Sequence, residues 1–125
     1  MVAAGVTQVA VGAMSGWGLA ALVGVPGLGE RLGVVDPVRL RQAHLDVLIM
    51  GGLVTAAGLV DDAPSWAKRA TKVGAWTNPL LFVPLAFRPD AARSKMYTAA
   101  SATSFTVTCA GWVGLALTAR RAARR

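Results

Sequence analysis

The amino-acid sequence predicts an all-α protein, an integral membrane four-helix bundle. Of the 125 residues, 54% are hydrophobic and only 15% are charged. The mean hydropathy of +0.52 lies above the usual balance of a soluble domain. Charged residues gather in the segments 30–41, 61–72, 88–95 and 120–125. Between them lie apolar stretches of roughly the 20 residues that a helix needs to cross a bilayer.

These stretches define four spans within a single transmembrane domain that covers residues 1–125. We expect them at roughly 2–25, 42–60, 71–87 and 97–119, followed by a basic tail at 120–125. The first stretch lacks a basic start and a small-residue cleavage motif, so we expect a retained helix rather than a cleaved signal peptide. The third stretch is the shortest and contains two prolines. A re-entrant or distorted third span is therefore the rival topology.

The first span carries closely spaced glycines. Gly12 and Gly16 have the small-xxx-small spacing that lets helix backbones approach each other in lipid, so we expect a helix contact there. The segment 26–36 that follows is rich in glycine and proline, which predicts a turn or a short irregular connection.

The second span begins with charged and polar residues, among them the only histidine of the chain. On a helix, His44, Gly51, Thr55 and Gly58 share one narrow face, which fits either a flat ligand or another helix backbone. Asp46 lies about 200° away around the same helix, so a direct pair with His44 is not expected. We expect Asp46 to pair with a nearby arginine at the level of the lipid headgroups.

The third span contains a polar group beside a break in the helix. Pro79 has no amide donor and frees the carbonyl of Ala75, and Pro84 does the same to a carbonyl one turn later. At membrane depth such carbonyls need partners from neighbouring helices, side chains, water or a ligand. Asn78 and Trp76 supply hydrogen-bonding groups beside this break. They serve either as links between helices or as the wall of a site.

The fourth span carries hydroxyl and aromatic side chains at helical spacing. We expect an inward stripe made of Thr98, Ser101, Phe105, Thr108 and Trp112. Such a stripe is more typical of helix packing than of a substrate path.

The net charge of +7 follows from the basic ends of the spans rather than from a nucleic-acid site. Arginines after a last membrane span are typical of the positive-inside bias and of attraction to anionic headgroups. Seven of the 13 basic residues fall on the side of the 61–72 segment and the tail. This bias predicts a protein of the cytoplasmic membrane with both termini in the cytoplasm, and no nucleic-acid partner.

Two segments resemble a known family of small membrane enzymes. Residues 41–58 (RQAHLDVLIMGGLVTAAG) and 74–82 (GAWTNPLLF) are similar to the core of styrene-oxide isomerase and of the related hydroxylaminobenzene mutase. In these four-span enzymes a histidine opens the second span, a glycine follows seven residues later, and a tryptophan-x-asparagine pattern lies in the third span. The similarity covers roughly the middle third of the chain.

The resemblance implies a cofactor, an assembly and a reaction. Styrene-oxide isomerase is a trimer that holds haem b at subunit interfaces through a histidine, which corresponds to His44. The iron acts as a Lewis acid on the epoxide oxygen, and Asn78 and Trp76 would be the catalytic residues that line the pocket. The implied protein is a homo-oligomeric isomerase or mutase that acts on a small apolar epoxide or arylhydroxylamine.

Three positions depart from the family pattern. Met50 stands where the isomerase has an asparagine, Gly74 where it has an aspartate, and Phe82 where it has a tyrosine. Met50 is also a second candidate haem ligand, supplied by a partner subunit, because a thioether can bind haem iron.

Two function classes follow, and each makes a different use of the same residues. In the first, His44 and Asn78 converge on a cavity that lipid cannot reach, and the protein is a haem-dependent enzyme. In the second, they are interhelical hydrogen bonders in a non-catalytic oligomeric membrane protein of the same fold. A small transporter or channel is less favoured, because the sequence places no charge clearly at mid-membrane.

Overall fold

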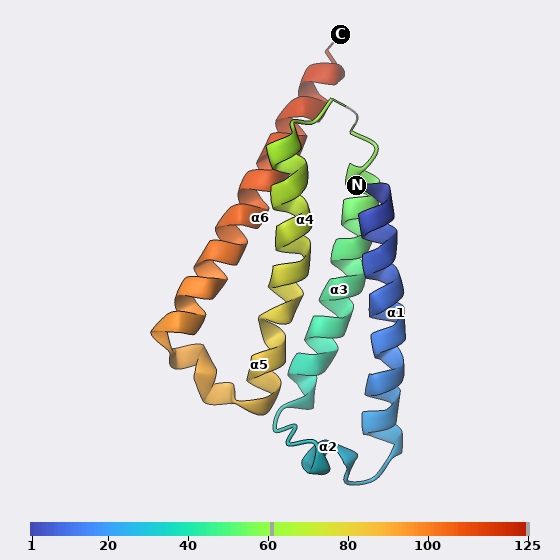
Figure 1. Cartoon of the computed structure of the whole chain (residues 1–125), viewed down its shortest axis with the longest axis vertical. Coiled ribbons are helices and arrows are strands. Elements are labelled where there is room, and N and C mark those ends of the chain that lie inside the picture. Colours follow the sequence, from blue (N-terminus) through green and yellow to red (C-terminus); the bar gives the residue numbers. More distant parts are fainter. Residues whose placement is uncertain (61, 125) are drawn as a thin grey trace.

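The computed structural model describes residues 1–60 and 62–124, and within them it contains helices and no strand. The long helices are α1 (Val2–Gly24), α3 (Pro37–Ala57), α4 (Ser65–Leu80) and α6 (Lys95–Ala122), and α4 continues into the short α5 (Phe82–Phe87). Two more short helices, α2 (Leu28–Arg31) and the 3₁₀ helix η1 (Pro89–Arg93), lie in the connections. Figure 1 shows the long helices side by side in one elongated bundle. The all-α prediction is confirmed.

Two of these helices, α1 and α6, are long and apolar enough to cross a membrane. Their 23 and 28 residues correspond to roughly 34 and 42 Å of helix, more than the hydrocarbon core requires. Charged residues interrupt the apolar character of α3 and α4. Spans two and three therefore stay predictions, while α1 and α6 support a membrane protein by length and composition.

Helices α3, α4 and α6 start earlier than the predicted spans, because polar turns precede the apolar residues. Asp36 caps α3 by accepting a hydrogen bond from the Val38 amide at 3.1 Å, and Pro37 occupies the first turn. Arg39 forms an ion pair with Asp36 at 3.4 Å. At the start of α6, Ser94 caps the helix in the same way, with the Tyr97 amide 3.1 Å away.

Helices α1 and α3 pack at backbone distance through glycines. A Cβ atom at Gly51 would lie 2.8 Å from the Val9 amide nitrogen and 3.0 Å from the Gly5 carbonyl oxygen, too close for any side chain. Gly12 faces Leu48 and Gly16 faces His44, so the predicted helix contact at these two glycines is confirmed. Of the two interpretations of the glycine face of α3, the structure supports the second, because a neighbouring helix backbone occupies this face.

Helices α4 and α6 form a second close pair. Gly111 packs on the Thr71 backbone, Gly74 on Thr108, and Gly114 on Trp66. The inward face of α6 carries the buried residues Ser104, Thr108, Gly111, Gly114 and Leu115. The expected stripe is therefore wrong for Thr98 and Phe105, which are exposed. The close glycine contacts determine which face of α6 packs against α4. This face is rotated away from the one that the hydroxyl and aromatic pattern predicted.

The third helical segment breaks at Leu81, between the two prolines. Gln8 of α1 donates a hydrogen bond of 2.5 Å to the Ala75 carbonyl that Pro79 leaves without an amide partner. This confirms that the freed carbonyl takes a partner from a neighbouring helix. After the break, α5 continues to the far end of the bundle (Figure 1), which favours a distorted helix over a re-entrant one.

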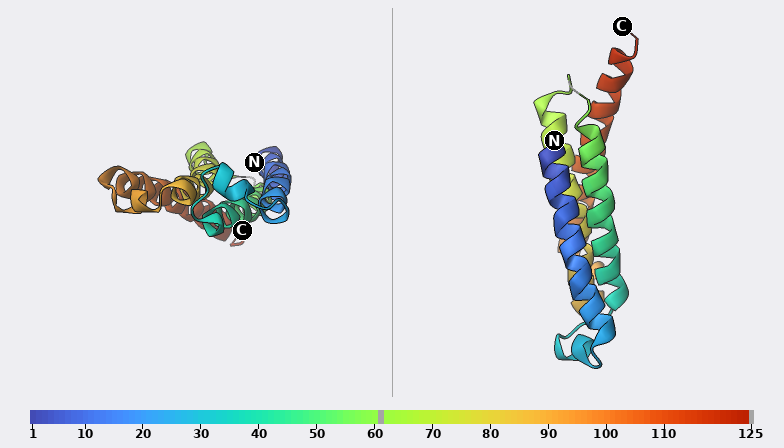
Figure 2. Two further views of the ribbon diagram at one scale, coloured as in Figure 1. Left: turned by 90° about the horizontal axis from the view of Figure 1, so that it is seen from below. Right: turned by 90° about the vertical axis from the view of Figure 1, so that its right-hand side faces the viewer.

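Both termini lie at the same end of the bundle, together with the connection between α3 and α4 (Figure 1). The α2 and η1 connections lie at the opposite end. Figure 2 shows the α1–α3 pair from the side and, from below, the lower part of α6 set away from this pair. This alternation of ends is the one that four spans require.

Candidate ligand groove at His44

His44 lies on the face of α3 that meets α1, at the border of a groove. Its Nδ1 atom is 2.9 Å from the Ser15 hydroxyl, and that hydroxyl donates to the Gly12 carbonyl at 2.7 Å. A serine hydroxyl has one hydrogen, so Ser15 accepts from Nδ1–H. This hydrogen bond leaves the lone pair on Nε2, the tautomer of a histidine that binds metal through Nε2.

The Nε2 atom has no hydrogen-bond partner within residues 1–60 and 62–124. Beside the ring stands Gly16, where a Cβ atom would lie 3.2 Å from Cε1 and 3.8 Å from Nε2. The missing side chain of Gly16 lets the imidazole pack closely against the α1 backbone. The donor set is thus a single oriented imidazole nitrogen.

An apolar groove of about 460 Å³ runs along His44, between α1, α3 and the α4–α5 segment. Trp76 and Pro79 form part of its wall, so the structure brings two of the predicted site residues, His44 and Trp76, to one groove. The other lining residues are almost all aliphatic: Val11, Leu19, Leu22, Leu28, Leu32, Leu40, Val47, Leu80 and Val83. The size lies in the range of small-molecule and cofactor sites.

Asn78 does not line this groove. It is buried between α4 and α6, where its Oδ1 atom accepts a hydrogen bond of 2.5 Å from Ser104, and Ser104 also contacts the Thr77 hydroxyl at 2.5 Å. The expectation that His44 and Asn78 converge on one cavity is therefore wrong for a single copy of the chain. Asn78 points toward α6, whereas His44 points toward α1.

Three polar residues that the sequence reasoning overlooked complete the arrangement. Ser15 orients the histidine, Gln8 binds the carbonyl freed by Pro79, and the Tyr97 hydroxyl donates to the Leu81 carbonyl at 3.0 Å. The signal was present for Gln8, since it is a lone amide in an otherwise apolar stretch. Ser15 gave a weaker signal, because serine is common among small residues at helix contacts.

Two of the positions that depart from the family pattern, Gly74 and Met50, supply no polar group to the groove at His44. At Gly74, a Cβ atom would lie 2.7 Å from the Thr108 Cβ and 2.9 Å from its Cα, so close contact with α6 excludes an aspartate. Met50 is not among the residues that line the groove at His44. Polar groups at these positions are therefore absent from this groove.

A second apolar groove of about 590 Å³ lies between the α4–α5 segment and the first half of α6, with Thr77, Ser104 and Tyr97 in its wall. Within the described residues, no three His, Cys, Asp or Glu side chains gather to hold a metal ion. No family model matches the chain, and neither the curated proteins nor the solved structures include a match.

Proposed function

We propose that this chain is a membrane-embedded haem protein that acts on a small apolar substrate, in the manner of the isomerases and mutases that its central segments resemble. His44 holds the iron of haem b through Nε2, and Trp76 forms a wall of the groove. The substrate class is an epoxide or an arylhydroxylamine. The observation that carries the proposal is the Ser15–His44 pair beside an apolar groove.

Two features of these residues suit the iron and the apolar ring of a haem. The Ser15 hydrogen bond fixes both the tautomer and the ring orientation of His44, as hydrogen-bond partners commonly do for metal-binding histidines. The aliphatic lining suits a flat, apolar macrocycle. His44 would hold the haem, which when bound would supply Lewis-acid chemistry toward a substrate oxygen.

Two features separate this chain from the enzymes it resembles. Gly74 has no room for the aspartate found there in the isomerase, and Asn78 already binds Ser104. If the chain catalyses a rearrangement, His44 and Trp76 carry more of the site than in those enzymes. We therefore assign Asn78 a positioning role, at the contact between α4 and α6, in place of the predicted catalytic one.

The protein is further proposed to be a homo-oligomer, with a trimer as the expected state. The groove at His44 is open along one side, and one protomer of 125 residues has little interior. A second copy that covers the open side would complete the burial of a flat ligand. Met50 of a neighbouring copy is a second candidate ligand in such an assembly.

The alternative is a non-catalytic oligomeric membrane protein of the same fold. The observation in its favour is that Asn78, Gln8 and Tyr97 all act as interhelical hydrogen bonders. His44 would then be one more such link, through Ser15.

The visible absorption spectrum separates the two functions. The protein is expressed with a haem supply and purified in mild detergent as wild type, His44→Ala and Gln42→Ala. Gln42 is an exposed residue of the same helix that bonds to Arg39, so it is the matched control. We expect a Soret band in the wild type and Gln42→Ala that is lost in His44→Ala. A colourless, intact wild-type oligomer would remove the haem proposal and leave the alternative.

Product analysis then tests the reaction. An aryl epoxide and an arylhydroxylamine are incubated with the haem-loaded wild type. The proposal expects an aldehyde from the first or a rearranged aminophenol from the second, and no product with His44→Ala. A haem-loaded protein that transforms neither compound would limit the proposal to haem binding.

A further inference from the structure

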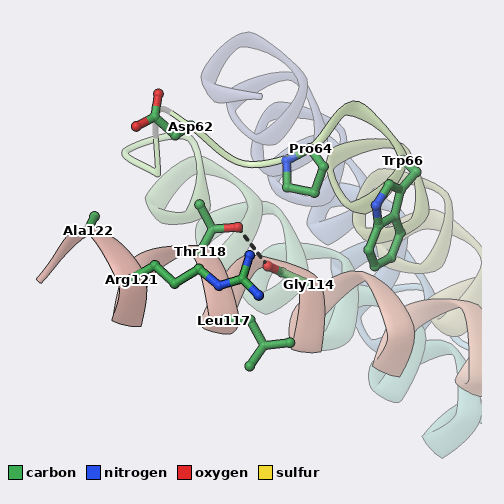
Figure 3. A pocket seen from close by; sticks show the side chains of 8 residues that line it. All are labelled: Asp62, Pro64, Trp66, Gly114, Leu117, Thr118, Arg121 and Ala122. Atoms are coloured by element: carbon green, nitrogen blue, oxygen red, sulfur yellow. Dashed lines mark hydrogen bonds between the residues drawn. The ribbon is translucent and has the colours of Figure 1, made fainter. Parts of the chain in front are cut away.

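A separate pocket lies at the end of the bundle that carries both termini. It has a volume of about 420 Å³ and sits between the last turns of α6 and the start of α4 (Figure 3). Its lining combines a cation with aromatic and apolar groups: Asp62, Pro64, Trp66, Gly114, Leu117, Thr118, Arg121 and Ala122. The groove at His44 shares none of these residues.

Arg121 is the cation of this pocket. Figure 3 shows its side chain folded back along α6 toward Gly114 rather than extended past the end of the helix. Side chains on a helix point toward its N-terminus, which for α6 is the direction of the bundle centre. Arg121 forms no hydrogen bond or ion pair within the described residues. The Asp62 carboxylate is directed away from the guanidinium (Figure 3).

Two more arginines add positive charge beside the pocket. Arg120 and Arg124 line a smaller hollow of about 160 Å³ that shares Leu117 and Arg121 with the first. The C-terminus of α6 contributes roughly half a negative charge, and the N-terminus of α4 on the opposite wall contributes roughly the same amount of positive charge. The dipoles offset each other. The residues that line the two hollows include three arginines and a single carboxylate, that of Asp62, and this excess of positive charge favours an anion.

The rest of the pocket is suited to the border between headgroups and hydrocarbon. The Trp66 ring packs on Gly114 and is 55% exposed, and Leu117 is 50% exposed. Tryptophan is enriched at this border because its ring is apolar and its N–H is polar.

We propose that this pocket binds one anionic phospholipid, with its phosphate on Arg121 and its acyl chains along Leu117 and Trp66. A planar guanidinium offers paired donors to phosphate oxygens, and such charge-assisted bonds are about twice as strong as neutral ones. The inference depends on α6 being a membrane span, not on haem.

Lipid-dependent thermal stability in detergent tests this site. Wild type, Arg121→Gln and Arg93→Gln are titrated with phosphatidylglycerol, phosphatidylcholine or free glycerol phosphate. Arg93 is an exposed arginine at the opposite end of the bundle, so it controls for the loss of one charge. Phosphatidylglycerol should raise the melting temperature of wild type and Arg93→Gln, and it should bind Arg121→Gln at least about tenfold more weakly.

Arg121→Lys tests the role of the paired donors, and phosphatidylcholine and free glycerol phosphate test the headgroup charge and the acyl chains. Arg121→Lys keeps the charge but loses the paired donors, so its affinity should fall between wild type and Arg121→Gln. An equal effect of phosphatidylcholine, or an unchanged affinity in Arg121→Gln, would overturn the proposal. Equal stabilisation by free glycerol phosphate would also overturn it, since the acyl chains would then play no part. None of these readouts uses haem.

Discussion

At the scale of single residues, polar side chains in this bundle join helices that are distant in sequence. Gln8 reaches the Ala75 carbonyl 67 positions away, and Tyr97 reaches the Leu81 carbonyl 16 positions away. Both carbonyls lie near the prolines that interrupt the third helical segment. Gln8 thus replaces the amide partner that Pro79 removes, and Tyr97 joins α6 to the residue at which the helix breaks.

Replacing Gln8 by methionine should destabilise the bundle by about 1–3 kcal/mol, because the Ala75 carbonyl would lose its buried partner. The measurement is the free energy of unfolding in detergent. In a Pro79→Ala background the same change should cost less, since the alanine introduced there supplies a backbone amide to that carbonyl. Equal costs in both backgrounds would show that Gln8 stabilises by packing alone.

Ser15→Ala should weaken haem binding by about 10–100-fold without removing the ligand, because His44 would lose the acceptor that fixes its tautomer. The measurement is a haem titration followed at the Soret band. Ser15→Thr, which keeps a hydroxyl, should retain more affinity than Ser15→Ala. Identical affinities for all three proteins would contradict the role given to Ser15.

At the level of residues, the sequence correctly predicted features that depend only on the covalent structure of a residue. The missing amide of Pro79 made the need for a partner at Ala75 certain. Which side chain supplies it depends on how α1 is rotated, and the sequence does not specify that rotation. The same reason explains the error at Asn78. Its amide was recognised as a polar group that needs a partner, but the direction it faces follows from the α4–α6 contact.

At the scale of helices, two close pairs build the molecule, α1 with α3 and α4 with α6. Each pair contacts through glycines whose missing side chains bring backbones together, at Gly51 in the first and at Gly111 in the second. Without a hydrophobic driving force between helices in lipid, such close packing is a main source of association.

Gly51→Ala should destabilise the α1–α3 pair, because the new methyl group would overlap the Val9 amide and the Gly5 carbonyl. We expect a loss of about 1–3 kcal/mol in the free energy of unfolding, typical of overpacking. Its neighbour Gly52 is the matched control, since a Cβ there has nothing within 4 Å. Gly52→Ala should be neutral or stabilising by up to about 1 kcal/mol. Equal effects at both positions would contradict the packing.

The number and order of the long helices were predictable from the apolar stretches, but their ends were not. The predicted spans describe which residues can lie in hydrocarbon, whereas α3 and α4 begin 5 and 6 residues earlier, in polar turns. The Asp36 cap fixes the start of α3, whereas α4 starts directly after Pro64 without a side-chain cap.

At the scale of the whole molecule, the topology is defined by the end of the bundle at which each terminus and each connection lies. The termini and the α3–α4 connection share one end, and α2 and η1 share the other (Figure 1). A protein with α1 and α6 as its only spans would also have both termini on one side. With four spans, the α3–α4 connection lies on the same side of the membrane as the termini. With two spans, it lies on the opposite side.

Labelling of single cysteines with a membrane-impermeant thiol reagent reports the side of the membrane on which the α3–α4 connection lies. In a Cys109→Ser background, Gly29→Cys, Leu59→Cys and Ala123→Cys are labelled in intact and in lysed cells. Four spans with cytoplasmic termini predict labelling of Gly29→Cys in intact cells, and of the other two only after lysis. Labelling of both Gly29→Cys and Leu59→Cys in intact cells would leave only two spans.

The most direct test of the central claim is chemical rescue of the proposed haem ligand. His44→Gly is purified with a haem supply, and its Soret absorption is recorded with and without added imidazole. If Nε2 of His44 binds the iron, the band is lost in the variant and returns with imidazole. A band that persists in His44→Gly without imidazole would contradict the account, because haem would then be held elsewhere in the protein.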